Sequence, residues 1–211
     1  MTILQRSDSW FTARIGKMTA SRIKDIDAKP KKGKAHNAIT LEVINERLTG
    51  TATEKPTTSL MQWGIDHEPQ AIAEYEVLTG AFVKGTSLID HPTIPFSGAS
   101  PDGLIGEDGQ IEAKCPSSTT HLNTLITREV PDEYIPQITW QLACTKRKWC
   151  DFISYDPRQP IGLNIIVIRV YAEDVDIARY EQLVIGFNSI VDNEIQALRN
   201  RNSWVLDKKV A

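Results

Sequence analysis

Cysteine is scarce in this chain of 211 residues, which contains three: Cys115, Cys144 and Cys150. An odd number at irregular spacing fits neither a disulfide framework nor a zinc ribbon. It is also one short of the four thiolates that usually hold an iron–sulfur cluster. We therefore expect three reduced thiols with a structural role.

Long apolar runs and an excess of positive charge are missing as well. The longest apolar runs, such as Ile165 to Ile168, are far too short to span a bilayer, and the first ten residues lack the apolar core of a signal peptide. We therefore expect an intracellular protein with no membrane contact. The net charge is −3, so any binding to nucleic acid must come from local patches.

Internal repeats, low-complexity tracts and linkers are absent too, so we expect one domain over residues 1–211, a length that suits a substantial core. One stretch, Asp27 to Asn37, concentrates positive charge together with a proline and a glycine. It predicts a basic loop that is either simply solvated or in contact with phosphate. Its lysines are Lys29, Lys31, Lys32 and Lys34.

Capping residues and apolar spacing predict an alternation of helices and strands. Helices are expected from Asp8 or Ser9, from near Thr19, and over Ala35–Thr49, Ser59–Thr79, Ser118–Thr127, Asp132–Thr145 and Ala172 to about Arg199. Strands are expected over Ala81–Val83, Ser87–Ile89, Phe96–Ala99, Leu104–Ile105, Gln110–Lys114, Asp151–Ser154 and Asn164–Val170. This order predicts an α/β or α+β fold with a mixed central sheet and helices on both faces.

The segment from Ser100 to Pro116 places two carboxylates and a lysine around a tight turn. With a two-residue turn in GEDG, Asp102 would lie one position from Glu112 on the neighbouring strand, within about 4.5–8 Å. Glu112 and Lys114 would point to one face, because side chains alternate along a strand. Ala113 would point its methyl group into the core and keep its carbonyl near the strand edge. The sequence therefore predicts that the two carboxylates and the ammonium group converge.

Such a group suggests phosphodiester hydrolysis. Two carboxylates repel each other unless a cation lies between them, and oxygen ligands favour Mg²⁺ or Mn²⁺. Lys114 would orient the attacking water, help to deprotonate it, or stabilise charge at phosphorus. The alternative is an ordinary hairpin that carries a Glu–Lys pair on its surface.

The spacing of Pro101-Asp102 and Glu112-Ala113-Lys114 matches the PD-(D/E)xK nuclease motif. Further stretches of the sequence make the match more specific. Together with the motif, they closely resemble the phage lambda exonuclease family, also called YqaJ-type viral recombinases. The resemblance implies a restriction-endonuclease-like core and covers nearly the whole chain from Ser9 onward. The blocks are WFTARIGKMTASRI, MQWGIDHEPQAIAEYEVLTG, GASPDGLI, IEAKCP, YIPQITWQLACT and FISYDPR, in this order.

The resemblance implies roles for individual residues. Asp102, Glu112 and the carbonyl of Ala113 are metal ligands in it, and Lys114 is the catalytic lysine. In the resemblance, Glu68 of the WGxxxE block is a further acidic residue of the metal centre. Without the resemblance, we would interpret Glu68 as an acidic residue on the surface of a helix.

Gln137 matches the glutamine that the family places beside the catalytic centre. Arg14 and Ser21 match a pattern, R-x-G-x-x-T-A-S, with which members grip the 5′-phosphate of the degraded strand. A planar guanidinium suits phosphate, although Arg14 is otherwise a surface charge and Ser21 a helix cap. Met61 occupies the position of an apolar residue that wedges into the duplex end.

The function implied is a Mg²⁺-dependent 5′→3′ exonuclease that degrades one strand of linear duplex DNA to mononucleotides. The resemblance also implies two metal ions, with Mn²⁺ as a substitute, a processive ring-shaped homotrimer, and a single-strand annealing protein as partner in recombination. It places the protein in the cytoplasm of a bacterial host and gives it a phage or prophage origin. The alternatives are another PD-(D/E)xK nuclease, such as a restriction-type endonuclease, and a non-catalytic module that binds DNA ends.

Overall fold

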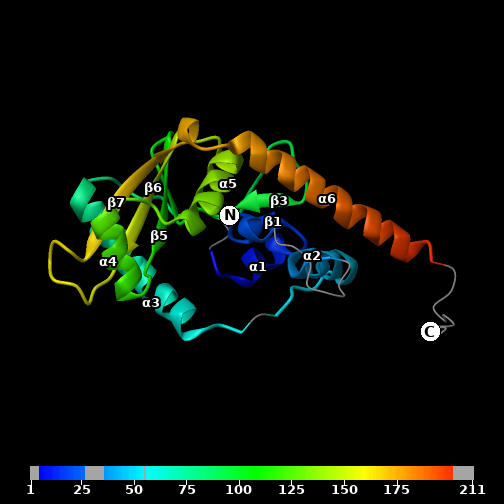
Figure 1. Ribbon diagram of the computed structural model, residues 1–211, viewed down its shortest axis with the longest axis horizontal. Helices are drawn as coiled ribbons and strands as arrows, with labels where there is room; N and C mark the ends of the chain where they lie inside the picture. The colour runs from blue at the N-terminus through cyan, green and yellow to red at the C-terminus, as the bar shows by residue number, and fades with distance from the viewer. Residues whose placement is uncertain (1–4, 27–35, 55, 202–211) are drawn as a thin grey trace.

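The computed structural model describes residues 5–26, 36–54 and 56–201 (Figure 1). The four lysines of the predicted basic loop, Lys29, Lys31, Lys32 and Lys34, lie outside the described residues. No helix in the described part of the chain is long and apolar enough to cross a membrane.

A four-stranded mixed sheet forms the centre of the fold. Its order is β4 (Gly103–Ile105), β5 (Gly109–Lys114), β6 (Trp149–Tyr155) and β7 (Ile165–Tyr171). The pairing of β5 with β6 is parallel, and the other two pairings are antiparallel. A smaller sheet has the order β1 (Met18–Thr19), β3 (Ser97–Ala99) and β2 (Ile89–Asp90). The predicted mixed sheet is therefore confirmed, with a second, smaller sheet that was not predicted.

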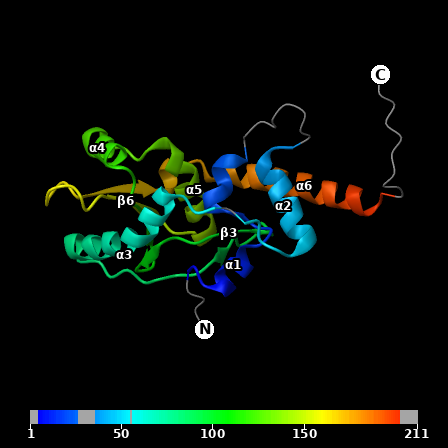
Figure 2. The same ribbon diagram turned by 90° about the horizontal axis from the view of Figure 1, so that it is seen from below.

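Helices cover both faces of the central sheet. Ala71 and Tyr75 of α3 (Ser59–Thr79) pack against Ile111 and Ala113 of β5. On the opposite face, α5 (Ile135–Thr145) packs Ile138 and other apolar residues against β6. Figure 2 shows β6 between α3 on one side and α4 (Ser118–Thr127) on the other.

The remaining helices form a layer over the smaller sheet. They are α1 (Asp8–Arg14), the 3-10 helix η1 (Ala20–Asp25), α2 (Ala38–Thr49) and α6 (Ile177–Arg199), with two further 3-10 turns at η2 (Asp132–Tyr134) and η3 (Ala172–Asp174). A second core joins η1, α2 and α6 to β1, β3 and α5, and its largest member is the fully buried Trp140. The long α6 extends from this layer toward one end of the molecule (Figure 1).

Capping side chains account for the helix boundaries. Thr58 and Ser117 accept hydrogen bonds from the backbones of α3 and α4, whose bounds agree with those predicted. Asn37 caps α2 in the same way, so the helix begins at Ala38 and not at Ala35. Pro69 lies inside α3, which continues through it to Thr79.

Two predicted strands and one turn were wrong in detail. No strand covers 81–83; Lys84 forms a single bridge with Leu104, and the strand expected over Ser87–Ile89 is Ile89–Asp90. Ile105 pairs with Gly109, so the hairpin turn contains three residues and not two. Gly106 in this turn has a φ of +49°, a conformation that glycine adopts without strain. The longer turn pairs Gly103 with Ile111, one residue from the predicted register.

Candidate active site

The carboxylate of Glu112 is the centre of the site. Glu112 lies on β5 and is 1% exposed. One carboxylate oxygen, Oε1, accepts hydrogen bonds from Lys114 Nζ and from Gln137 Nε2, the latter at 2.6 Å. The other oxygen, Oε2, accepts a hydrogen bond from Gln141 Nε2. A buried carboxylate is stable only with such donors, and Glu112 has three.

Two periodicities bring these groups together. Glu112 and Lys114 share one face of β5, because side chains alternate along a strand. Gln137 and Gln141 are four residues apart and share one face of α5. The packing of α5 against the sheet places the two amides over the carboxylate. Glu112 and Lys114 meet as predicted, and Gln137 lies beside them, where the family resemblance implied it.

Asp102 lies at the end of the β4–β5 ladder, and its side chain is half-buried. Its N–H donates to the Ile111 carbonyl at 3.1 Å, and its Oδ2 accepts from the Ala113 N–H at 2.8 Å. Burial, followed by the charges of Glu112 and Glu68, raises the pKa of Asp102 well above its usual value. The carboxylates therefore lie close enough to repel one another.

Lys114 supplies the positive charge of the site. Burial lowers the pKa of Lys114, but the charges of Glu112 and Asp102 outweigh burial, and the net pKa is raised. Its ammonium group also lies 5.5 Å from the centre of the Tyr134 ring. In the metal-free site Lys114 is therefore an ammonium ion at neutral pH, held against the Glu112 carboxylate.

Glu68 approaches the site from α3. Its carboxylate pairs with Arg6 at 2.5 Å, and Arg6 has a φ of +64°, which is unusual for a residue with a side chain. The charge of Glu68 raises the pKa of Asp102, and after burial it is the main cause that raises the pKa of Cys115 to about 12. Glu68 is therefore part of the same electrostatic environment as Asp102, although its direct partner is Arg6.

The carboxylate oxygens of this site are the kind of ligand that a divalent cation prefers. In the described ranges, no three His, Cys, Asp or Glu side chains are grouped closely enough to hold a metal ion. Asp102 and Glu112 nevertheless supply hard oxygen donors, and the raised pKa of Asp102 shows repulsion that a cation would relieve. The residues present therefore suit Mg²⁺ or Mn²⁺.

A second polar cluster surrounds Arg14 at the end of α1. Its guanidinium donates to Ser21 Oγ at 3.2 Å, to Thr19 Oγ1 at 3.1 Å and to Ser100 Oγ at 3.4 Å. Trp10 stacks on this guanidinium, with Cζ 4.1 Å from the ring centre, and also donates to Ser100 at 3.0 Å. Arg14 and Ser21, predicted as a pair, are therefore in contact.

Arg14 has no carboxylate at ion-pair distance among the residues that the structure describes. Burial, followed by the charge of Arg22, lowers the pKa of Arg14 to about 10, which leaves it charged at neutral pH. A half-buried guanidinium whose hydrogen bonds in the described residues go to hydroxyl groups is suited to an anionic ligand. Ser100 lies two residues before Asp102, so one short segment joins this cluster to the carboxylates.

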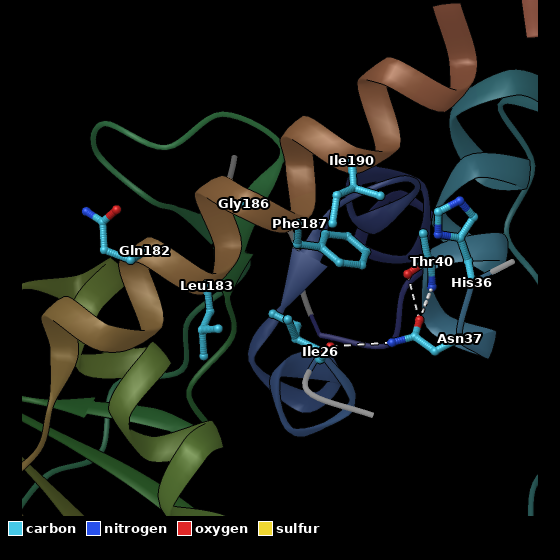
Figure 3. A pocket seen from close by; sticks show the side chains of 9 residues that line it. All are labelled: Ile26, His36, Asn37, Thr40, Gln182, Leu183, Gly186, Phe187 and Ile190. Atoms are coloured by element: carbon cyan, nitrogen blue, oxygen red, sulfur yellow. Dashed lines mark hydrogen bonds between the residues drawn. The ribbon is translucent and has the colours of Figure 1, made fainter. Parts of the chain in front are cut away.

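Other residues were missed or lie elsewhere. Gln141 was not predicted, although its spacing of four from Gln137 was a usable signal. Met61 is 53% exposed in the first turn of α3. A pocket between α2 and α6, about 360 Å³ in volume, contains no predicted site residue (Figure 3). It is lined by Ile26, His36, Asn37, Thr40, Gln182, Leu183, Gly186, Phe187 and Ile190.

Comparisons with known proteins give the family and the type of fold. A family model described as a YqaJ-like viral recombinase domain matches residues 9–148. An alkaline exonuclease from Laribacter hongkongensis is 43% identical, with a TM-score of 0.83; the match covers 92% of this chain and 96% of that one. A second structure of that exonuclease, in complex with dAMP, gives a TM-score of 0.84 with the same identity and coverage. These matches confirm the predicted PD-(D/E)xK type of fold.

More distant similarity is limited to the fold. A phage-related exonuclease from Haemophilus somnus 129PT is 15% identical, with a TM-score of 0.65, and the match covers 86% of this chain and 96% of that one. The comparison with curated proteins gave no match.

Proposed function

The chain belongs to the family of YqaJ-like viral recombinase domains, and on that premise we propose that it is a Mg²⁺-dependent 5′→3′ exonuclease acting on linear duplex DNA. Membership of this family, with the Asp102, Glu112 and Lys114 group intact, makes the chain a deoxyribonuclease of the exonuclease type. The polarity, the metal and the mode of digestion are the proposed part.

One observation carries the proposal: the segment Ser100–Pro101–Asp102 joins the Arg14 cluster to a pair of carboxylates. Ser100 contacts Arg14 and Trp10, and Asp102 interacts electrostatically with Glu112. A terminal phosphate at Arg14 would thus lie at a fixed distance from the group that cuts, and a fixed distance decides which bond is cut. An enzyme that cuts within a strand has no use for a pocket that accepts a terminal phosphate.

The carboxylates and the lysine divide the chemistry. Asp102, Glu112 and the Ala113 carbonyl are the groups that would hold one or two Mg²⁺ ions, or Mn²⁺ as a substitute, with Glu68 as a further acid. A bound divalent cation supplies positive charge to the scissile phosphate and makes water a better nucleophile. Lys114, charged and partly exposed, stabilises the negative charge that develops at phosphorus.

Gln137 and Arg14 position the reacting groups. Gln137 holds one oxygen of Glu112, so the carboxylate keeps a defined orientation. Arg14, with Ser21 beside it, binds the 5′-phosphate through a planar fork of donors. Met61 is exposed on α3 and is available to contact the end of the duplex.

Family membership supports a further set of proposals: a ring-shaped homotrimer, processive release of mononucleotides, and a single-strand annealing protein as partner. A ring would explain how a chain with a net charge of −3 stays on DNA, because only the lining of the channel need be basic. Sedimentation at micromolar concentration tests this assembly. A stable monomer with equally long digestion runs would contradict the ring and leave the nuclease assignment intact.

The experiment that tests the proposed activity compares two forms of one plasmid with Mg²⁺ present. The linear form should be degraded to mononucleotides, and the covalently closed circular form should stay intact. Cleavage of the closed circle would favour a restriction-type endonuclease instead. Binding to linear ends without any product would favour a non-catalytic module.

A further inference from the structure

The face of α5 that covers the site carries a row of polar side chains opposite a second row on β5. Residues four apart on a helix share a face, and so do residues two apart on a strand. The helix row is Gln137, Gln141 and Thr145, and the strand row is Gln110, Glu112 and Lys114. Hydrogen bonds join the rows at Gln137–Glu112, Gln141–Glu112 and Thr145–Gln110.

Two amide groups in these rows are incompletely bonded. Gln110 and Gln141 are both 0% exposed. Gln110 Oε1 accepts from Thr145 Oγ1 at 2.8 Å, whereas Gln110 Nε2 has no hydrogen-bond partner in good geometry among the described residues, although the Gln110 side chain lies beside the Cys150 thiol. Gln141 Nε2 donates to Glu112, whereas Gln141 Oε1 likewise lacks a partner within the described ranges. One buried donor and one buried acceptor therefore remain on neighbouring positions of the two rows.

These two groups are complementary, because one is an amide N–H and the other an amide oxygen. Buried polar groups in proteins are nearly always satisfied, by another protein group or by an ordered water. A hydrogen bond between Gln110 Nε2 and Gln141 Oε1, direct or through one buried water, would satisfy both groups. The hydrogen bonds would then run without a break from Thr145 through Gln110 and Gln141 to Glu112.

We propose that Gln110 and Gln141 are positioning residues, which together fix the orientation of the Glu112 carboxylate. This inference rests on the proposed function, in which Glu112 is a metal ligand. Gln137 and Lys114 act on Oε1 of Glu112, so among the described residues Gln141 alone restrains Oε2. Gln110 orients the Gln141 amide, so that its NH₂ group and not its oxygen faces the carboxylate.

Neutral amides suit this task. They hold the carboxylate by hydrogen bonds and add no charge, so Glu112 keeps its attraction for a divalent cation. Groups that orient metal ligands from outside typically change metal affinity by about 10- to 100-fold when they are lost. A glutamine that merely filled the core would affect folding and leave metal affinity as it was.

The test measures divalent-cation affinity in the DNA-free protein by calorimetry with Mn²⁺, together with kcat and KM on linear duplex. The variants are Gln141→Met, Gln110→Met and the double variant, because methionine has a similar length and no amide. The control is Thr139→Val, which removes a buried hydroxyl from α5 whose one hydrogen-bond partner in the described part of the chain is the Ile135 carbonyl of its own helix. Gln141→Asn, a shorter amide, serves if Gln141→Met does not fold.

Gln141→Met should weaken Mn²⁺ binding by about tenfold or more and lower kcat, with little change in KM for DNA. Gln110→Met should do the same to a smaller degree. The double variant should be no worse than Gln141→Met, because the two residues act in series. Thr139→Val should keep the wild-type affinity even if its melting temperature falls.

Wild-type Mn²⁺ affinity in Gln141→Met, or in Gln141→Asn, would overturn the inference. So would a wild-type protein that binds no divalent cation, because Glu112 would then have no ligand role to be positioned for. A protein that binds Mn²⁺ through this arrangement yet leaves DNA uncut would contradict the proposed function alone, since the affinity measurement does not depend on cleavage.

Discussion

Asp102 Oδ2 accepts a hydrogen bond from the backbone N–H of Ala113 at 2.8 Å. This bond joins the two halves of the motif, because Ala113 lies between Glu112 and Lys114 on β5. It holds the Asp102 carboxylate near that of Glu112, and the resulting repulsion contributes to the raised pKa of Asp102. The arrangement favours a bound cation over two free carboxylates, and it leads to the first prediction.

Asp102→Asn and Glu112→Gln should abolish cleavage in Mg²⁺ and largely preserve DNA binding, because these groups hold the cation and not the duplex. Cleavage is followed with linear duplex, and binding is measured in EDTA. Asp108→Asn is the matched control: Asp108 lies in the hairpin turn nearby, exposed and paired with Lys148. Near-normal turnover in either carboxylate variant would show that the metal site lies elsewhere.

Lys114→Met should also inactivate the enzyme, for a different reason. It removes the ammonium group that stabilises charge at phosphorus and keeps both carboxylates, so kcat should fall while cation binding persists. Calorimetry with Mn²⁺ on the variant checks the second half of this prediction. Loss of cation binding together with activity would mean that Lys114 serves mainly to hold Glu112 in place.

The contacts of Arg14 predict a preference for phosphorylated ends. Wild type should degrade 5′-phosphorylated duplex faster than 5′-hydroxyl duplex, and Arg14→Ala should lose most of that difference. A charged hydrogen bond contributes roughly 1.5–3 kcal/mol, so the ratio of initial rates should change by about tenfold or more.

The ratio is measured at one fixed salt concentration, because phosphate contacts depend on salt. Lys24→Ala, an exposed cation on η1, is the control and should keep the wild-type ratio. A wild-type ratio in Arg14→Ala would remove Arg14 from the phosphate pocket and direct attention to Ser21 or the lysines of residues 29–34.

Asp156 predicts a dependence of stability on pH. Its carboxylate is fully buried and accepts from Arg158 Nε at 2.6 Å. Burial raises the pKa of Asp156, but hydrogen bonds from Arg158 and Ser118 outweigh burial and place it well below its usual value. A lowered folded-state pKa stabilises the protein above the unfolded value of about 3.9, and this contribution is lost as the pH falls toward the folded value.

Asp156→Asn should therefore lower the free energy of unfolding at pH 7 by about 1–3 kcal/mol. Urea denaturation at pH 7, 4 and 2.5 measures the difference from wild type, which should shrink below about pH 4. A difference that stays constant over this range would mean that the ionised carboxylate adds nothing to stability.

Local signals in the sequence predicted much of the fold and the centre of the site. The predicted bounds of α3 and α4 agree with the structure, in which Thr58 and Ser117 cap the two helices, because a helix boundary of this kind depends on residues next to it in the sequence. Strand alternation gave the shared face of Glu112 and Lys114. The three buried thiols are free, as their number and spacing predicted.

The features that were missed depend on contacts between distant segments. The partner of Glu68 is Arg6, 62 residues away, and no local pattern links the two. The bond from Gln141 to Glu112 depends on how α5 packs against β5. The turn length was misjudged because Gly106 permits a left-handed residue in the loop, and one extra turn residue shifts the register of the whole hairpin.

The most direct test of the central claim uses linear duplex DNA with a 5′-phosphate, incubated with wild type and Mg²⁺. One preparation carries a label in the terminal nucleotide of the 5′ end, and a second carries it at the 3′ end. A 5′→3′ exonuclease releases the 5′ label first, as a mononucleotide, and leaves the 3′ label in long products until late. Early release of the 3′ label, or release of the 5′ label only within longer fragments, would contradict the proposed function.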